Sequence, residues 1–276
     1  MELLAELAAW SVLAFCLLLF ASQWLVLQLG RKLGVWQRTA RGTGEAEGVA
    51  VVVGGLLGLL AFILALTLSY SSTRFDERRA GALAEANAIG TAWLRAQAID
   101  HPRSREIAKQ LETYVHVRKE FMLAPRNSPT LSELSERSAG LQSGMWKHIS
   151  AIVHERQDPV VAALMASIND VFDTSAAEQF AFEALLAPQL FWLLIILALI
   201  SMAALGYQLG LKGQKTFVLT LGLVAVWTAV IMVILDLSAP RAGTFRTDLS
   251  IYDRTLEGFK GEVSDSPMPS SEKDVK

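Results

Sequence analysis

The sequence predicts an all-α membrane protein with four transmembrane helices. A helical domain is inserted between the second and third spans and is formed partly by extensions of those spans. Three observations predict this fold class. Apolar side chains make up 52% of the 276 residues and the mean hydropathy is +0.36, which is too apolar for an ordinary soluble domain. Four uncharged apolar runs are long enough to cross a bilayer, which needs roughly 20 helical residues. One long segment of mixed polarity, with repeated helix start signals, separates the second run from the third.

The four apolar runs lack the alternation of barrel strands, so helices are the structures that satisfy their backbone in lipid. They are Leu7–Leu29, Val49–Tyr70, Leu190–Leu209 and Thr216–Leu235. The first run is not a cleavable signal peptide, because acidic Glu2 and Glu6 stand at its front. We therefore predict a multi-pass protein of the inner membrane whose partner is the lipid bilayer. The predicted parts are 1–70 (spans one and two), 71–187 (helical domain), 188–237 (spans three and four) and 238–276 (tail).

The inserted segment shows helix signals throughout. Pro102 suits the first turn of a helix, Thr130 with Glu133 forms a possible capping box, and Asp158 precedes Pro159 as a further start. The predicted helices cover 71–99, 103–123, 131–156 and 159–186, with a loop at 124–130. Beyond about residue 259 the tail is polar and rich in Ser and Pro, which predicts disorder.

No proline or turn pair interrupts the chain between Val49 and Ile99. This predicts one continuous helix of about 75 Å, long enough to leave the bilayer and enter the helical domain. Helix 159–186 would return antiparallel to it. The short links 30–48 and 210–215 are rich in Lys and Arg, which predicts that they are cytoplasmic. The N-terminus and the helical domain would then be extracytoplasmic.

The second span carries small residues at helical spacing, namely Gly54, Gly58, Ala61 and Ala65. Small residues let helix backbones approach closely in lipid, so helix packing within the chain or between subunits is the first interpretation. A stripe that lines a pore is the second.

A polar stripe follows on the same helix. Thr67, Ser71, Arg74 and Arg78 are three or four residues apart and therefore share one face. At the mouth of a pore such groups would concentrate anions. The alternative is that the arginines only extend into the headgroup layer.

Two further polar groups stand out. Glu85 and Asn87, with Asn169 and Asp173 on the returning helix, predict a polar network that fixes the register of two long helices, with an ion site as the alternative. At the end of the fourth span, Asp236 is expected to pair with Arg241 or Arg246, because an unpaired acid at the lipid boundary is costly. That segment could equally line a conduction path.

Enzyme and nucleic-acid signals are weak. The net charge of −2 gives no basic patch for nucleic acid, and the single cysteine, Cys16, allows no intrachain disulfide. Glu112 and His116 lie one helical turn apart, a spacing that is common by chance. No HExxH, P-loop, GxGxxG or nucleophile elbow is present. We predict no catalytic residues, no metal site and no cofactor.

Two stretches resemble the bacterial bestrophin-like family of four-span membrane proteins. They are "GLLGLLAFILALTLSYSSTRFDERRAGALAEANAIGTAWLRA", residues 55–96, and "ILDLSAPRAGTFR", residues 234–246. The family takes its name from a distant likeness to bestrophins, which are oligomeric anion channels. The resemblance implies a homo-oligomer around an axis, with the second span and its Arg-rich extension nearest that axis, and anions as possible ligands. It also implies a cytosolic helical domain, the opposite of the orientation that the charges favour. The sequence has no dense acidic run of the kind that binds calcium in animal bestrophins.

Two functions follow from these patterns. The first is an oligomeric ion channel, with the polar stripe at its mouth. The second is a non-conducting membrane scaffold or sensor whose helical domain binds a partner. A membrane enzyme would require Asn87, Asn169 and Asp173 to surround a pocket that holds a metal.

Overall fold

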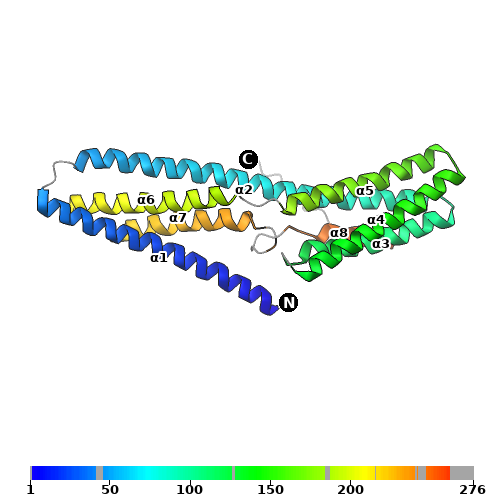
Figure 1. Ribbon diagram of the computed structural model, residues 1–276, viewed down its shortest axis with the longest axis horizontal. Helices are drawn as coiled ribbons and strands as arrows, with labels where there is room; N and C mark the ends of the chain where they lie inside the picture. The colour runs from blue at the N-terminus through cyan, green and yellow to red at the C-terminus, as the bar shows by residue number, and fades with distance from the viewer. Residues whose placement is uncertain are drawn as a thin grey trace, which may run out of the picture. The chain divides into compact units, whose positions relative to one another are not determined.

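The structure is a computed structural model that describes residues 2–41, 46–125, 128–183, 187–214, 216–239, 241 and 247–261. All regular structure in these ranges is α-helical (Figure 1). The helices are α1 (Glu2–Arg41), α2 (Ala46–Gln97), α3 (Pro102–Leu123), α4 (Pro129–Glu155), α5 (Pro159–Glu183), α6 (Pro188–Lys212), α7 (Phe217–Leu237) and α8 (Ser250–Phe259).

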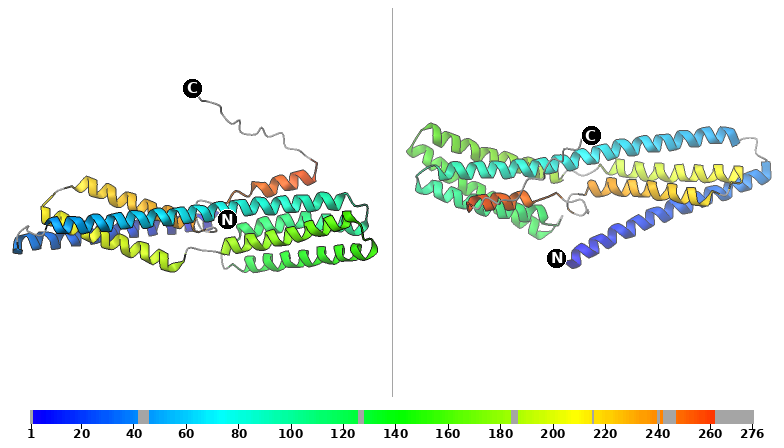
Figure 2. Two further views of the ribbon diagram at one scale, coloured as in Figure 1. Left: turned by 90° about the horizontal axis from the view of Figure 1, so that it is seen from above. Right: turned by 180° about the vertical axis from the view of Figure 1, so that it is seen from behind.

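The chain divides into two compact units. Unit 1 contains residues 1–76 and 184–246, and unit 2 contains residues 77–183 and 247–276. Helix α2 contributes to both units as one uninterrupted helix, which confirms the predicted continuous helix (Figure 2). With 52 residues it is about 78 Å long.

Unit 1 is held together by α1 and α6, which approach each other unusually closely. A Cβ atom placed on Gly30 or Gly34 of α1 would overlap a backbone carbonyl of α6. A Cβ atom on Gly206 or Gly210 of α6 would overlap a carbonyl of α1. Both pairs have the G-x-x-x-G spacing that allows close helix contact in lipid. Leucines, isoleucines and valines of α1, α2, α6 and α7 complete the core of this unit.

Unit 2 is a helical bundle with its own apolar core. Residues of α2, α3, α4, α5 and α8 share one buried cluster that includes Ile89, Leu111, Ile149, Leu164 and Tyr252. The predicted helices of this region are confirmed to within about three residues at most ends. The N-cap of α4 differs from the prediction. Ser128 caps it by accepting a hydrogen bond from the Leu131 backbone N–H at 3.2 Å, with Pro129 in the first turn. The capping box at Thr130 was therefore wrong.

Among the described residues, five helices are long and apolar enough to cross a membrane. They are α1, α2, α5, α6 and α7, so α5 is a candidate beyond the four predicted spans. Its mean hydropathy of 1.2 is the lowest of the five, and its buried residues include Ser167, Ser175 and Glu178. Helix α5 belongs to unit 2, where it shares the bundle core with α3 and α4.

Two elements differ from the sequence-based expectation. Helix α1 continues to Arg41, well past the predicted end of the first span, because Gly30 and Gly34 pack against α6 as helical residues. The predicted tail contains helix α8, which buries Tyr252 in the bundle core. Disorder was predicted from about residue 259, and residues 262–276 lie outside the described residues.

Candidate functional site

Helix α2 presents two different faces along its membrane portion. Leu60 and Leu64 are buried in the core of unit 1, whereas the predicted packing residues Gly54, Gly58, Ala61 and Ala65 are all exposed. A Cβ atom added to Gly54 or Gly58 would have no neighbour within 4 Å in the described chain. Packing within the chain is therefore the wrong explanation for these two glycines. Packing between subunits and pore lining remain as interpretations.

The predicted pore-mouth stripe lies largely on the other face. Thr67 and Ser71 are buried. The Thr67 hydroxyl donates to the Ile63 carbonyl at 2.7 Å, and the Ser71 hydroxyl lies 2.9 Å from the hydroxyl of Ser238 on α7. Arg78 is buried in unit 2. The side chains of three of the four residues are therefore buried within the chain.

Arg74, the fourth residue of the stripe, is half-exposed. Its Nε donates to the Tyr70 hydroxyl at 3.0 Å, and its guanidinium carbon lies 5.3 Å from the Tyr70 ring centroid. The aromatic ring one turn earlier thus holds this arginine at the surface of α2.

A buried polar cluster occupies the centre of unit 2. Glu85 of α2 accepts hydrogen bonds from Arg118 of α3, at 2.5 Å from Nε and 3.3 Å from Nη2. The Tyr252 hydroxyl of α8 donates to Glu85 Oε2 at 2.7 Å. Arg118 also lies over the Phe121 ring, with its guanidinium carbon 4.7 Å from the centroid. One carboxylate therefore joins three helices.

A second set of bonds extends this cluster to α4 and α5. The Tyr114 hydroxyl donates to the Ser175 hydroxyl at 2.8 Å, and the Gln142 side-chain amide donates to Tyr114 at 2.8 Å. The Ser175 carbonyl accepts from Arg118 Nη2 at 3.4 Å. Every helix of the bundle thus contributes to one polar network, which fixes the register of the helices because each bond tolerates little displacement.

Burial and charge shift the pKa values of this network. Burial alone would lower the pKa of Arg118, but the Glu85 carboxylate raises it above its usual range. Burial raises the pKa of the Tyr252 hydroxyl, and the negative charge of Glu85 raises it further. Burial also raises the pKa of Tyr114. The two phenols therefore stay neutral donors while Arg118 stays charged.

A second carboxylate, that of Glu178 on α5, lies beside this cluster. It is 1% exposed, and neither of its oxygens has a hydrogen-bond partner among the described residues. It rests against Gly81 of α2, where a Cβ atom would overlap Glu178 Oε2. Gly81 stands one turn after Arg78 and one turn before Glu85 on α2, so the carboxyl sits between an arginine and a like-charged residue.

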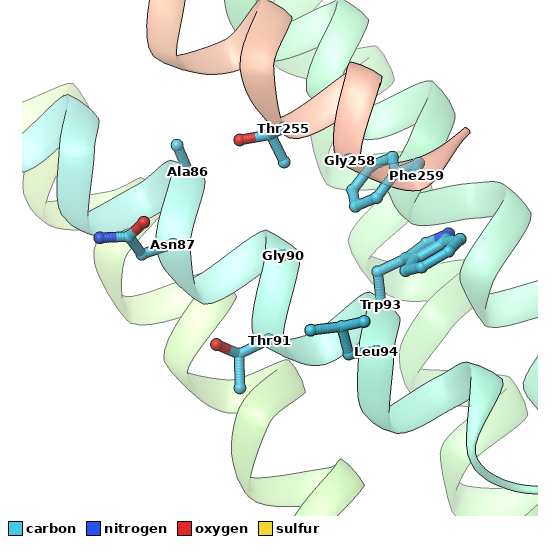
Figure 3. A pocket seen from close by; sticks show the side chains of 9 residues that line it. All are labelled: Ala86, Asn87, Gly90, Thr91, Trp93, Leu94, Thr255, Gly258 and Phe259. Atoms are coloured by element: carbon cyan, nitrogen blue, oxygen red, sulfur yellow. The ribbon is translucent and has the colours of Figure 1, made fainter. Parts of the chain in front are cut away.

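The other members of the predicted network lie elsewhere. Asn87, Asn169 and Asp173 are all exposed, and no hydrogen bond joins them within the described ranges. Glu85 does belong to a buried network, but its partners come from α3 and α8. Asn87 instead borders a cavity of about 370 Å³ between α2 and α8, where Trp93 and Phe259 stack with centroids 4.6 Å apart (Figure 3).

Two further predicted groups are the ion pair at the end of the fourth span and the Glu112–His116 pair. Asp236 and Arg241 are half-buried, and Arg246 lies outside the described residues, so their pairing is still a prediction. Glu112 accepts a hydrogen bond from Trp93 Nε1 at 2.9 Å, while His116 is exposed. No group of three metal-ligating side chains occurs in the described part of the chain.

The predictions from sequence missed two features of the structure, namely the close contact of α1 with α6 and the buried charges of unit 2. The motifs Gly30-x-x-x-Gly34 and Gly206-x-x-x-Gly210 are visible in the sequence and signal close helix contact. Arg118 and Glu178 each occupy an otherwise uncharged helical face, which signals a buried charge. Nothing in the sequence, however, identifies Tyr252 as the partner of Glu85, because 167 residues separate them.

Comparisons with known proteins identify solved structures with a similar fold. Solved structures of a bacterial bestrophin homologue from Klebsiella pneumoniae are similar in fold at 14% sequence identity. Two variants give TM-scores of 0.65 and 0.67, with 87% and 91% of this chain and 98% of the homologue covered. A third structure gives 0.63 over 86% of this chain and 98% of the homologue. A comparison with curated proteins found no match.

The bestrophin-like domain family matches residues 13–251, a range that includes α2, most of both units and all members of the buried polar cluster except Tyr252. The expected resemblance is thereby confirmed, and the chain belongs to the bestrophin-like family of multi-pass membrane proteins.

Proposed function

We propose that this chain is one subunit of a homo-oligomeric ion channel, selective for anions, in which α2 lines the axis. The observation that carries this proposal is the exposed face of Gly54, Gly58, Ala61 and Ala65 on a long uninterrupted helix. Lipid contact gives no reason for small residues, whereas close approach of several α2 helices around an axis requires them. Membership of the bestrophin-like family supports the same arrangement.

The proposed topology has four spans in the inner membrane, formed by α1, α6, α7 and the first part of α2. Helix α5 belongs to the extramembrane bundle, because it shares polar contacts with α3 and carries the buried Ser175 and Glu178. The proposed parts are 1–70, 71–187, 188–237 and 238–276. The basic links then place the N-terminus and the bundle outside the cytoplasm.

Orientation is tested by labelling single cysteines in intact cells, in a Cys16→Ser background. Gly140 on α4 and Thr39 on α1 are both exposed. We expect a membrane-impermeant thiol reagent to label Gly140→Cys and to leave Thr39→Cys unlabelled. The reverse pattern would place the bundle in the cytosol.

Conduction is tested with the full chain reconstituted in planar bilayers. We expect an anion current that a water-soluble thiol reagent blocks when Gly58→Cys is introduced in the Cys16→Ser background. Thr67→Cys is the matched control, because Thr67 lies on the buried face of α2 and its cysteine should not react. Arg74→Glu should shift the current toward cations, since Arg74 is half-exposed and is the first arginine after the apolar segment of α2. Silent bilayers with correctly assembled oligomers would contradict the channel.

A non-conducting scaffold or sensor is the second candidate. The burial of Thr67, Ser71 and Arg78 inside their own subunit favours it, since these residues then stabilise the fold and do not line a path. Measuring the mass of the protein in nanodiscs separates the two functions. A monomer supports the scaffold, and a symmetric ring supports the channel.

A further inference from the structure

The carboxyl group of Glu178 has an environment that an ionised carboxylate does not tolerate well. Both oxygens are buried and have no hydrogen-bond partner among the described residues. An ionised carboxylate in such a place loses its hydration and gains no hydrogen bond in exchange, which disfavours the ionised form. A neutral carboxylic acid loses much less.

The charged and titratable groups around Glu178 come from three other helices. Arg78 and Glu85 lie on α2, Arg118 on α3 and the Tyr252 hydroxyl on α8. Arg118 is already bonded to both oxygens of Glu85, so its charge is largely compensated. The negative charge of Glu85 disfavours a second negative charge on Glu178. A metal ion is a poor occupant, since no three suitable ligands converge in the described part of the chain.

The backbone of α2 makes room for this carboxyl group. Gly81 lacks the Cβ atom that would overlap Glu178 Oε2, so the Glu178 side chain of α5 contacts α2 at this point. The charge on Glu178 therefore acts at the contact between these two helices. Repulsion from Glu85 and the recovery of hydration both favour separation of the helices once the group is ionised.

We propose that Glu178 is a proton-binding site: it holds a proton while α5 lies against Gly81 of α2, and loss of that proton loosens the contact. The site binds no ligand except the proton, and it acts independently of whether the chain conducts ions. Burial, followed by the negative charge of Glu85, raises the pKa of Glu178 to about 8, although Arg118 and Arg78 act in the opposite direction.

Infrared difference spectroscopy of the full chain in nanodiscs tests the protonation. We expect a carboxylic acid C=O band near pH 6 that disappears with a midpoint near pH 8. The band should be missing in Glu178→Gln and retained in Glu183→Gln, the matched control, because Glu183 is exposed on the same helix. A wild-type protein without this band near pH 6, or a band that persists in Glu178→Gln, would overturn the proposal.

A distance measurement tests the structural consequence. Spin labels at Ala80→Cys and Ala177→Cys, in the Cys16→Ser background, report on α2 and α5 from exposed positions. We expect a narrow distance distribution near pH 6 and a broader or longer one near pH 10, about two units on either side of the midpoint. In Glu178→Gln, which mimics the neutral acid, the distribution should stay narrow at both pH values. An unchanged wild-type distribution, or the same change in Glu178→Gln, would disprove the coupling.

Discussion

Glu85 Oε1 and Arg118 Nε lie 2.5 Å apart, and both side chains are almost completely buried, at 0% and 1% exposure. Such a pair contributes little net stability when compared with apolar side chains of the same size, because both charges lose their hydration. The pair instead specifies how the helices of the bundle are arranged. The pair joins α2 to α3, and the Tyr252 hydroxyl brings α8 to the same carboxylate.

Removing one partner of this pair should be strongly destabilising. Arg118→Met leaves the Glu85 charge buried without its cation, which costs about 3–5 kcal/mol. Lys119→Met is the matched control, because the adjacent Lys119 pairs with Asp253 at a partly exposed site, where an ion pair contributes at most about 1 kcal/mol. Denaturant unfolding of the full chain in detergent measures the loss in the free energy of unfolding for both variants. Equal losses would show that the buried pair has no special role.

The Tyr252 hydroxyl should control how firmly α8 is held. Tyr252→Phe removes a hydrogen bond to a charged acceptor, which contributes about 1.5–3 kcal/mol. We expect amide hydrogen exchange of residues 250–259 to become at least about tenfold faster, as local opening of α8 becomes easier. Asp253→Asn, which alters a first-turn acid of α8 and its partly exposed pair with Lys119, should change the exchange far less. Unchanged exchange in Tyr252→Phe would mean that apolar contacts alone hold the helix.

The contact between α1 and α6 should not tolerate larger side chains. Gly206→Leu places a side chain where the Leu27 carbonyl lies, so the helices must separate. We expect a loss of about 3 kcal/mol or more in stability, in the upper range for overpacked sites. Gly222→Leu on α7 is the control, because this glycine is exposed and a Cβ atom there meets no described atom within 4 Å. Thermal unfolding in detergent, followed by size-exclusion chromatography, compares the two variants.

The stability of the bundle should fall as the pH rises from about 4.5 to about 8. The pKa of Glu178 is raised in the folded protein, so its contribution is fully present below the unfolded value near 4.5 and is lost as the pH rises through about 8. Each pKa unit corresponds to about 1.4 kcal/mol. We expect the unfolding midpoint to fall between pH 6 and pH 9 in the wild type and in Glu183→Gln, and to fall less in Glu178→Gln. An equal decrease in the unfolding midpoint of the wild type and both variants would show that other groups cause the effect.

The sequence predicted the helices well, since their signals are local. Apolar runs, Pro102 and Asp158–Pro159 each act over a few residues, and the structure has helices where these signals stand. Boundaries that depend on contacts with distant segments were missed. Helix α1 passes its predicted end because of glycines that pack on α6, and α8 is ordered by the bundle.

The sites were harder to predict for the same reason. Helical spacing correctly placed Thr67, Ser71 and Arg78 on one face of α2, but spacing does not say whether that face meets water, lipid or protein. Glu85 was singled out, yet its partners Arg118 and Tyr252 are far away in the sequence. Asn87 was predicted to join a polar network between two helices, although it is exposed.

The amino-acid sequence by itself determined the class of protein, the long second helix and the family, because hydropathy and short motifs are properties of neighbouring residues. Only the tertiary structure decided which face of α2 is buried, which side chain balances Glu85 and why Glu178 rests on Gly81. Those features depend on the pairing of helices that are far apart in the chain, and a buried charge is stabilised or penalised only by what the fold places beside it.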